Sequence, residues 1–168
     1  MASNAWNVRG FLCGIMLSCA GVALCMIGTT TNHWREWETG SGHEGLWRNC
    51  TPNCTSIGIQ HVAAYIHVAR GCMITACVVA GGSALLLPAV LCGKLGKKWG
   101  MTSGSLLILT AVPILVGATW YGAETKGPYE FGYSIITAWV AVGVLAVGGV
   151  IILHTSERLT QREFLRLN

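Results

Sequence analysis

The sequence predicts an all-α membrane protein whose single domain has four transmembrane helices. Of its 168 residues, 52% are apolar and only 11% are charged, and the mean hydropathy is +0.54. A soluble domain carries about 25% charged residues. The chain also contains four apolar stretches of about 20 residues, the length that crosses a bilayer core, and none of them contains Asp, Glu, Lys or Arg. We therefore expect one tetraspan domain over residues 1–168.

The apolar stretches place the expected spans at about 11–31, 71–91, 101–122 and 132–154. A cleaved signal peptide is the alternative for the first stretch, Phe11–Thr31. Its apolar run exceeds the about 7–15 residues of a signal peptide, however, and only Arg9 is basic before it. Residues 62–68 are also largely apolar, so the second helix should continue about two turns outside the bilayer. Arg70 would then lie near the outer interface.

Small residues predict where the helices approach one another. Gly10-x-x-x-Gly14 and Gly100-x-x-x-Gly104 allow close contact between backbones. The same is expected of five further glycines in the spans, Gly81, Gly82, Gly143, Gly148 and Gly149. We interpret these residues as packing sites within one bundle. Homodimerisation through one of these faces is the alternative.

The placement of Lys and Arg predicts that both termini are cytoplasmic, because cytoplasmic loops carry an excess of these residues. The cytoplasmic set would be Arg9, Lys94, Lys97, Lys98, Arg158, Arg162 and Arg166, and the extracellular set Arg35, Arg48, Arg70 and Lys126. Loops 32–60 and 123–131 are then extracellular, and loop 92–100 and tail 155–168 are cytoplasmic. We expect a multi-pass protein of the plasma membrane, with cell junctions as one location. The basic excess faces anionic lipid, so a nucleic-acid partner has no support.

Six of the seven tryptophans fall near expected membrane interfaces, where their amphipathic rings are favoured. Trp6 and Trp99 would lie on the inner side, and Trp34, Trp37, Trp120 and Trp139 on the outer side. Trp47 is the exception, because it lies in the long polar loop. A tryptophan there is either a buried anchor or an exposed binding residue.

Cys50 and Cys54 are the only cysteines in the expected extracellular loops, and they would face an oxidising compartment. We therefore expect a disulfide between them. Such a small ring gains about 2 kcal/mol from loop entropy and holds a turn. The alternative is a metal site that combines both cysteines with the loop histidines His33, His43 and His61. Cys-x-x-x-Cys lacks the usual zinc spacing, so no metal or cofactor is expected.

Three covalent modifications have candidate positions. Asn49-Cys50-Thr51 and Asn53-Cys54-Thr55 are N-glycosylation sequons in the first extracellular loop, and Asn53 is the favoured acceptor. Cys92 adjoins a lysine-rich inner loop, a setting that suits reversible palmitoylation. The remaining cysteines, Cys13, Cys19, Cys25, Cys72 and Cys77, should behave as small apolar residues.

Several motifs together point to a family. Trp34 follows the first span, then come Gly45-Leu46-Trp47, Cys50 and Cys54. This pattern resembles the W…GLW…C…C signature of the claudin, peripheral myelin protein, epithelial membrane protein and lens fibre membrane intrinsic protein superfamily. Residues 69–74 (ARGCMI) and 131–140 (FGYSIITAWV) resemble the openings of the family's second and fourth spans. The latter is nearer to the epithelial membrane and lens-fibre branch.

The resemblance implies a left-handed four-helix transmembrane bundle with a small extracellular antiparallel β-sheet. Four strands would come from the first loop and one from the second. Trp34, Gly45, Leu46 and Trp47 would anchor the sheet to the bundle, and Arg70 would donate to sheet carbonyls. Two departures stand out. Only three residues separate Cys50 from Cys54, and the terminal Asn168 offers no apolar side chain to a PDZ groove, so no PDZ scaffold is expected.

Two classes of function remain. The sequence has no Cys-x-x-Cys redox motif, nucleophile elbow or carboxylate pair in a span, so no enzyme is expected. A transport path is marked by ionisable residues inside the membrane, and His154, at the inner end of the fourth span, is interpreted as interfacial. One class is adhesion, junction formation or membrane organisation through the sheet, with a membrane-protein partner in cis or trans that includes a second copy. The other is an auxiliary subunit or regulator of a channel, receptor or vesicle membrane protein.

A mixed aromatic and acidic set in the extracellular loops is typical of a recognition rim. Its candidate partner contacts are Glu36, Trp37, Glu38, His43 and Tyr129. In the tail, Arg158, Arg162 and Arg166 are spaced four apart, so a helix would align them along one face. That face suits membrane lipids with anionic headgroups, at about 1 kcal/mol per basic residue. We therefore expect a protein partner to bind the outer surface and not the tail.

Overall fold

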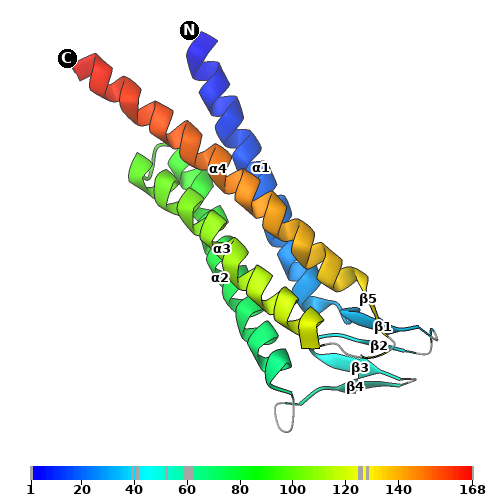
Figure 1. Cartoon of the computed structure of the whole chain (residues 1–168). Helices are drawn as coiled ribbons and strands as arrows, with labels where there is room; N and C mark the ends of the chain where they lie inside the picture. The colour runs from blue at the N-terminus through cyan, green and yellow to red at the C-terminus, as the bar shows by residue number, and fades with distance from the viewer. Residues whose placement is uncertain are drawn as a thin grey trace.

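A computed structural model describes residues 2–38, 40, 42–51, 53–58, 63–124, 127 and 129–167, with side chains described from residue 8 to residue 158 of these. Four long helices run alongside one another, and a small sheet extends from one end of them (Figure 1). Both termini lie at the other end of the bundle (Figure 1). We call these the sheet end and the terminal end.

The four helices are α1 (Ala2–Thr30), α2 (Ala64–Leu91), α3 (Lys97–Glu124) and α4 (Tyr133–Leu167). Each contains a segment long and apolar enough to span a membrane, with mean hydropathies of 2.2, 2.1, 1.8 and 2.5. A helix satisfies its own backbone hydrogen bonds in lipid, which is why these apolar stretches are helical. The prediction of four transmembrane-length helices is confirmed.

The helix ends extend beyond the expected spans. α2 begins at Ala64, upstream of Gly71, and α4 continues through the tail as far as Leu167. Much of the outer surface of the bundle is apolar, and Met16, Val78 and Leu85 leave 71%, 68% and 81% of their surface exposed. Large apolar side chains exposed to this degree suit a lipid environment.

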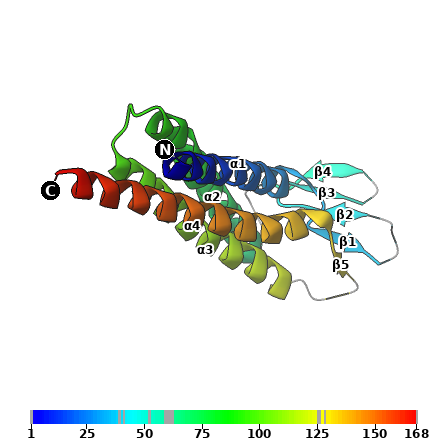
Figure 2. The ribbon, with the colours of Figure 1, turned by 90° about the horizontal axis from the view of Figure 1, so that it is seen from above.

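The bundle is closed by contacts between α1 and α4, α4 and α3, α3 and α2, and α2 and α1. Figure 2 shows α1 and α4 as neighbours, and Figure 1 shows that they diverge toward the two termini. Glycines make these contacts close. A Cβ added to Gly14 would lie 2.7 Å from Ile152, and one added to Gly149 would lie 2.7 Å from the carbonyl oxygen of Gly104. Gly10, Gly100 and Gly148 pack in the same way against Thr155, Ser156 and Ser18.

The packing role expected of Gly81, Gly82 and Gly143 is wrong. A Cβ added to any of the three would have no neighbour within 4 Å. Among the described residues, no atom of another helix lies within 4 Å of an added Cβ at these positions on α2 and α4. Composition identifies small residues in a span but does not say toward which neighbour each one points.

The sheet has five strands within the described residues: β1 (Arg35–Trp37), β2 (His43–Glu44), β3 (Arg48–Cys50), β4 (Cys54–Ser56) and β5 (Tyr129–Phe131). Their order is β4-β3-β2-β1-β5, every neighbouring pair is antiparallel, and Figure 2 shows the strands in this order. The predicted sheet, with four strands from the first loop and one from the second, is confirmed. Such short strands need the bundle for their stability.

Glycine packing gives a first prediction. We expect Gly149→Ala to destabilise the bundle by about 1–3 kcal/mol, because the new methyl group meets the backbone of α3, which cannot move aside as a flexible side chain would. Gly81→Ala is the matched control and should be neutral or stabilise the protein by up to about 1 kcal/mol, because Ala favours the helix more than Gly does. Unfolding of the purified protein in detergent measures both. Equal losses in the two variants would contradict the packing described.

Candidate functional site

The sheet is attached to the bundle at the end of α1, and Trp34 makes the first attachment. The last carbonyls of a helix have no partner within the helix. The indole nitrogen of Trp34 donates to the carbonyl oxygen of Gly28 at 2.8 Å, and the ring is fully buried with its edge toward Tyr121 of α3. Trp34 therefore belongs to the core. Its expected place among the lipid-interface tryptophans is wrong.

Trp47 makes the second attachment. Its indole nitrogen donates to the carbonyl oxygen of Thr29 at 2.6 Å, and the guanidinium of Arg70 lies 4.9 Å from the centre of its ring. The Trp47 side chain thus links the loop between β2 and β3 to α1 and α2. Its ring packs against the core cluster.

Arg70, near the start of α2, supports the sheet from below. It donates from Nε to the carbonyl oxygen of Leu46 at 2.7 Å, and from Nη2 to that of Ile57 at 3.0 Å. A third, longer bond reaches the carbonyl of Gly58 at 3.4 Å. A guanidinium has five donors in a fixed fork, so one side chain can satisfy several carbonyls. Arg70 is buried, and its positive charge is stabilised by the backbone carbonyl oxygens that accept these hydrogen bonds.

Gly45 and Leu46 complete the junction. Leu46 is fully buried, and a Cβ on Gly45 would overlap the backbone of Asn32. The start of α4 is joined to the same region. The Ser134 backbone nitrogen donates to the carbonyl oxygen of His33 at 3.0 Å, and the His33 backbone nitrogen donates to the Ser134 hydroxyl at 3.1 Å. The sheet is thereby fixed to three helices.

A buried ion pair lies within the sheet. Arg35 on β1 and Glu44 on β2 are cross-strand partners, and Arg35 Nη2 lies 2.6 Å from Glu44 Oε2. Their side chains are only 14% and 8% exposed. Burial lowers the pKa of Arg35, but the net shift is upward, because the hydrogen bond to Glu44, then Tyr121, the charge of Glu44 and Tyr65 all raise it. Sequence reasoning missed this pair, because only the strand register brings the two charges together.

The five expected contact residues do not all lie on the same face of the sheet. Side chains alternate between faces along a strand. Trp37 packs on its partner Tyr129 with ring centres 4.5 Å apart, and Arg35 lies 4.6 Å from the centre of the same Tyr129 ring. Glu36 and His43 are cross-strand partners on the other face. Glu38 is exposed in the turn after β1. The five residues therefore do not form one continuous patch.

The face with Glu36 and His43 contains a hollow of about 390 Å³. Two of the residues that line it, His33 and His43, have stacked imidazole rings whose centres lie 3.8 Å apart. Tyr133 stacks on the other side of His33 at 4.8 Å, and His33 Nδ1 lies 3.0 Å from Glu36 Oε1. The wall is lined by Gly40, Gly42, Cys50 and Cys54.

Cys50 and Cys54 are joined by a disulfide that connects the end of β3 to the start of β4. Both sequons lie beside it. Asn53 is exposed, whereas Asn49 is partly covered and its side-chain oxygen accepts a hydrogen bond from the Thr51 hydroxyl at 2.9 Å. The structure thus leaves Asn53 more accessible than Asn49. His61, part of the alternative metal site, lies outside the described residues.

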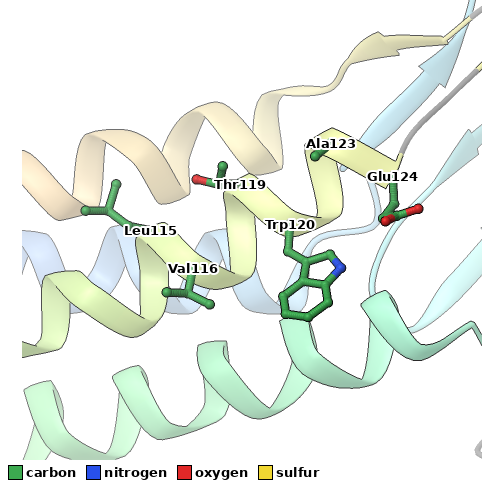
Figure 3. Close-up of a pocket in the computed structure, with 6 residues that line it drawn as sticks. All are labelled: Leu115, Val116, Thr119, Trp120, Ala123 and Glu124. Atoms are coloured by element: carbon green, nitrogen blue, oxygen red, sulfur yellow. The ribbon is translucent and has the colours of Figure 1, made fainter.

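An apolar groove of about 530 Å³ lies on α3 near the sheet end (Figure 3). Leu115, Val116, Thr119, Trp120, Ala123 and Glu124 line it. Trp120 is half exposed, as is Trp139 on α4. Both rings therefore add to the apolar outer surface of the bundle near the sheet end. At the terminal end, Trp99 is half exposed, while the side chain of Trp6 lies outside the described ones.

The cysteines of the helices differ among themselves. Cys92 is exposed at the end of α2, close in sequence to the exposed Lys94 and Lys98. Cys25 of α1 and Cys77 of α2 lie with their sulfur atoms 3.3 Å apart, and the Thr29 hydroxyl lies 3.4 Å from Cys77 Sγ. Sequence reasoning treated these two as unrelated apolar residues, because helix-to-helix register has no signal in a single sequence.

A profile of the PMP-22/EMP/MP20/Claudin family matches residues 9–152. The chain belongs to this family of tetraspan membrane proteins. It is 26% identical to lens fiber membrane intrinsic protein of Rattus norvegicus over 149 residues, which cover 82% of this chain and 86% of the relative. It is 28% identical to epithelial membrane protein 2 of Danio rerio over 156 residues, with coverages of 86% and 94%.

Claudin-18 of Bos taurus is similar as well, at 23% identity in an alignment of 210 positions, which covers 97% of this chain and 78% of the relative. The family expected from Trp34, the Gly45-Leu46-Trp47 motif and the cysteine pair is confirmed. The relatives carry the names of membrane proteins, and none of those names describes a catalytic activity.

Trp47 gives a second prediction. Trp47→Ala should destabilise the protein by about 3 kcal/mol and reduce its delivery to the cell surface, because it removes a packed ring and leaves the Thr29 carbonyl without its donor. Trp47→Phe keeps a ring and should lose about 1–3 kcal/mol. Surface biotinylation and unfolding in detergent measure the two effects, with Trp139→Ala as an exposed control. Normal delivery of Trp47→Ala would show that the residue is not an anchor.

The buried ion pair gives a third prediction. Glu44→Gln should cost about 3 kcal/mol, because it leaves the buried guanidinium of Arg35 without its carboxylate. In the double variant Arg35→Gln/Glu44→Gln, the loss should be smaller than the sum of the single losses by about 0.5–3 kcal/mol. Glu130→Gln, on an exposed carboxylate, serves as the control. Strict additivity in unfolding experiments would exclude a stabilising coupling between the two side chains.

Proposed function

We propose that this chain is a non-enzymatic protein of the plasma membrane that contacts a membrane-protein partner through its sheet end, in cell adhesion, junction formation or membrane organisation. One observation carries the proposal: the sheet is fixed to α1 and α2 by Trp34, Trp47 and Arg70 and to α4 by Ser134, while among the described residues no further strand pairs with the edge strands β4 and β5. β4 is exposed throughout, and Phe131 of β5 is 61% exposed. A rigid, exposed element of this kind needs little reorganisation to bind.

The proposed topology has one domain over residues 1–168, an extracellular sheet and cytoplasmic termini. Both termini lie at one end of the bundle, which is also where Lys94 and Lys98 are exposed (Figure 1). The excess of basic residues supports a cytoplasmic terminal end. The Cys50–Cys54 disulfide at the sheet end suits an oxidising compartment. In this topology Asn53, or less readily Asn49, accepts a glycan, and Cys92 is placed for palmitoylation.

The acidic side chains exposed at the sheet end favour a partner whose contacting surface is basic. Arg35 is neutralised by Glu44, and Arg70 is used by backbone carbonyls. Among the side chains that the structure describes, the charges left toward solvent are mainly acidic: Glu36, Glu38, Glu124 and Glu130, against Arg48. Complementary potentials across an interface raise the association rate and suppress wrong partners. The Trp37–Tyr129 pair would supply the aromatic part of the contact.

An auxiliary subunit of a larger membrane protein is the second candidate. The apolar groove along α3 favours it, because the groove lies on a membrane-facing surface and would fit against a helix of another protein (Figure 3). In that case the partner would contact Trp120 as well as the sheet. Recovery of a large channel or receptor with the protein from native membranes would favour this candidate, and self-association on one membrane or between membranes would favour adhesion.

Charge reversal at the sheet end gives a fourth prediction. Glu38→Lys/Glu130→Lys changes two exposed carboxylates and should leave folding and surface expression intact. In cells that express the protein, we expect this variant to reduce cell aggregation or partner recovery about tenfold, corresponding to about 1.4 kcal/mol. Glu157→Lys, an exposed carboxylate at the terminal end, is the matched control and should have no effect.

A truncated chain tests the tail separately. Truncation after Arg158 keeps Thr155 and Ser156, which pack against Gly10 and Gly100, and removes residues 159–168. This chain should aggregate cells as the full-length protein does. Complete loss of aggregation at normal surface expression would refute the proposal that the sheet end, and not the tail, contacts the partner.

A further inference from the structure

The hollow on the outer face of the sheet collects three side chains that ligate metals. His33 precedes β1, Glu36 lies in β1, and His43 lies in β2, across the strand pair from Glu36. All three are only partly buried, so water and ions can reach them. We propose that this hollow is a binding site for a divalent transition-metal cation, with Zn²⁺ as the best match, held by His33, Glu36 and His43.

The spacing of His33 and Glu36 fits a metal. His33 Nδ1 lies 3.0 Å from Glu36 Oε1. Zn²⁺ binds histidine nitrogen and carboxylate oxygen at about 2.0–2.1 Å, so two such ligands at a tetrahedral centre lie about 3.3 Å apart. A cation can therefore replace the proton between the two atoms with a small outward movement of the carboxylate. The exposed side of Glu36 leaves room for that movement.

His43 supplies the third ligand. Its ring is stacked on that of His33 with centres 3.8 Å apart and an interplanar angle of 13°. A rotation of the His43 side chain that opens this stack would direct a ring nitrogen toward the cation. Gly42 precedes His43 and Gly40 also lines the hollow, so no bulky side chain from these positions blocks the rotation. The two-histidine, one-carboxylate set leaves the fourth position for water or for a ligand from a partner.

The surroundings of the pair suit a cation. Burial, and next the neighbouring ring of His33, lower the pKa of His43, while Glu36 acts in the opposite direction. The other groups near the pair are the Tyr133 ring from α4, the Cys50–Cys54 disulfide from β3 and β4, and Glu130, the cross-strand partner of Glu36. Two carboxylates on this part of the sheet favour a bound positive charge.

The chemistry of the ligands selects the cation. Ca²⁺ takes six to eight oxygen ligands and Mg²⁺ keeps most of its waters, whereas imidazole suits Zn²⁺, Cu²⁺ and Ni²⁺. The sulfur atoms of Cys50 and Cys54 lie within 4.8 Å of a ring nitrogen of His43. Because they are joined in a disulfide, they are not thiolate ligands. This site therefore differs from the cysteine-based alternative in the sequence, which would need a reduced pair.

Calorimetric titration of the tag-free, full-length protein in detergent with ZnCl₂, under non-reducing conditions, tests the proposal. We expect one Zn²⁺ per chain, no comparable heat with CaCl₂ or MgCl₂, and loss of detectable binding in His43→Ala. Glu36→Gln should weaken binding at least about tenfold. His67→Ala removes an exposed histidine outside the hollow and should bind Zn²⁺ as the wild type does. Gel filtration confirms that each variant is folded.

Cobalt replaces zinc in a second measurement that identifies the ligands. Co²⁺ held by nitrogen and oxygen gives visible ligand-field bands without a thiolate charge-transfer band in the near ultraviolet. That spectrum, lost in His43→Ala and retained in Cys50→Ser/Cys54→Ser, is the expected result. Binding that appears only after reduction, with a charge-transfer band, would assign the metal to the cysteines and overturn the proposal. Undiminished binding in His43→Ala, or no binding to the wild type, would overturn it as well.

Discussion

The carbonyl oxygens at the end of α1 are the constraint on which the arrangement of the sheet depends. A helix that ends inside protein at a membrane boundary leaves carbonyls that need donors. Here the indole nitrogens of Trp34 and Trp47 donate to Gly28 and Thr29. A tryptophan offers one donor and a large apolar ring, so the same side chain satisfies the helix end and fills the space beneath the sheet. In the opposite direction, Arg70 of α2 donates hydrogen bonds from a helix to the loop that contains Leu46.

Much of the fold could be predicted from the sequence because its strongest signals are local. Apolar stretches such as Phe11–Thr31 identify a span without any knowledge of neighbours, since lipid allows few alternatives to a helix. The Gly45-Leu46-Trp47 motif was informative through its resemblance to the family signature, which implied the sheet and its attachment to the bundle. Each of the three residues has a specific role at the junction: a Cβ on Gly45 would overlap Asn32, Leu46 is fully buried, and Trp47 donates to the Thr29 carbonyl.

The features that sequence reasoning missed all depend on register. Arg35 and Glu44 are separated by a turn, and only the pairing of β1 with β2 shows that they meet. The same pairing divides the expected contact residues, with Trp37 on one face and Glu36 on the other. Gly81 and Gly149 are both glycines within apolar spans, yet of these two only Gly149 packs against another helix. A single sequence contains no information on which helix faces are paired, so such assignments need coordinates.

The two faces of the sheet differ in burial, and this difference determines which of their residues can be substituted without a loss of stability. Arg35 and Glu44 are largely buried, so a change at either residue alters stability, whereas Trp37 and Tyr129 on the same face are only partly buried. The strands are too short to be stable alone, and their persistence depends on contacts with the bundle. Glu36 and His43 on the opposite face, and the edge residues of β4 and β5, are exposed or only partly buried. Side chains at these positions can therefore change to suit a partner or an ion while the Trp34, Trp47 and Arg70 contacts keep the sheet in place.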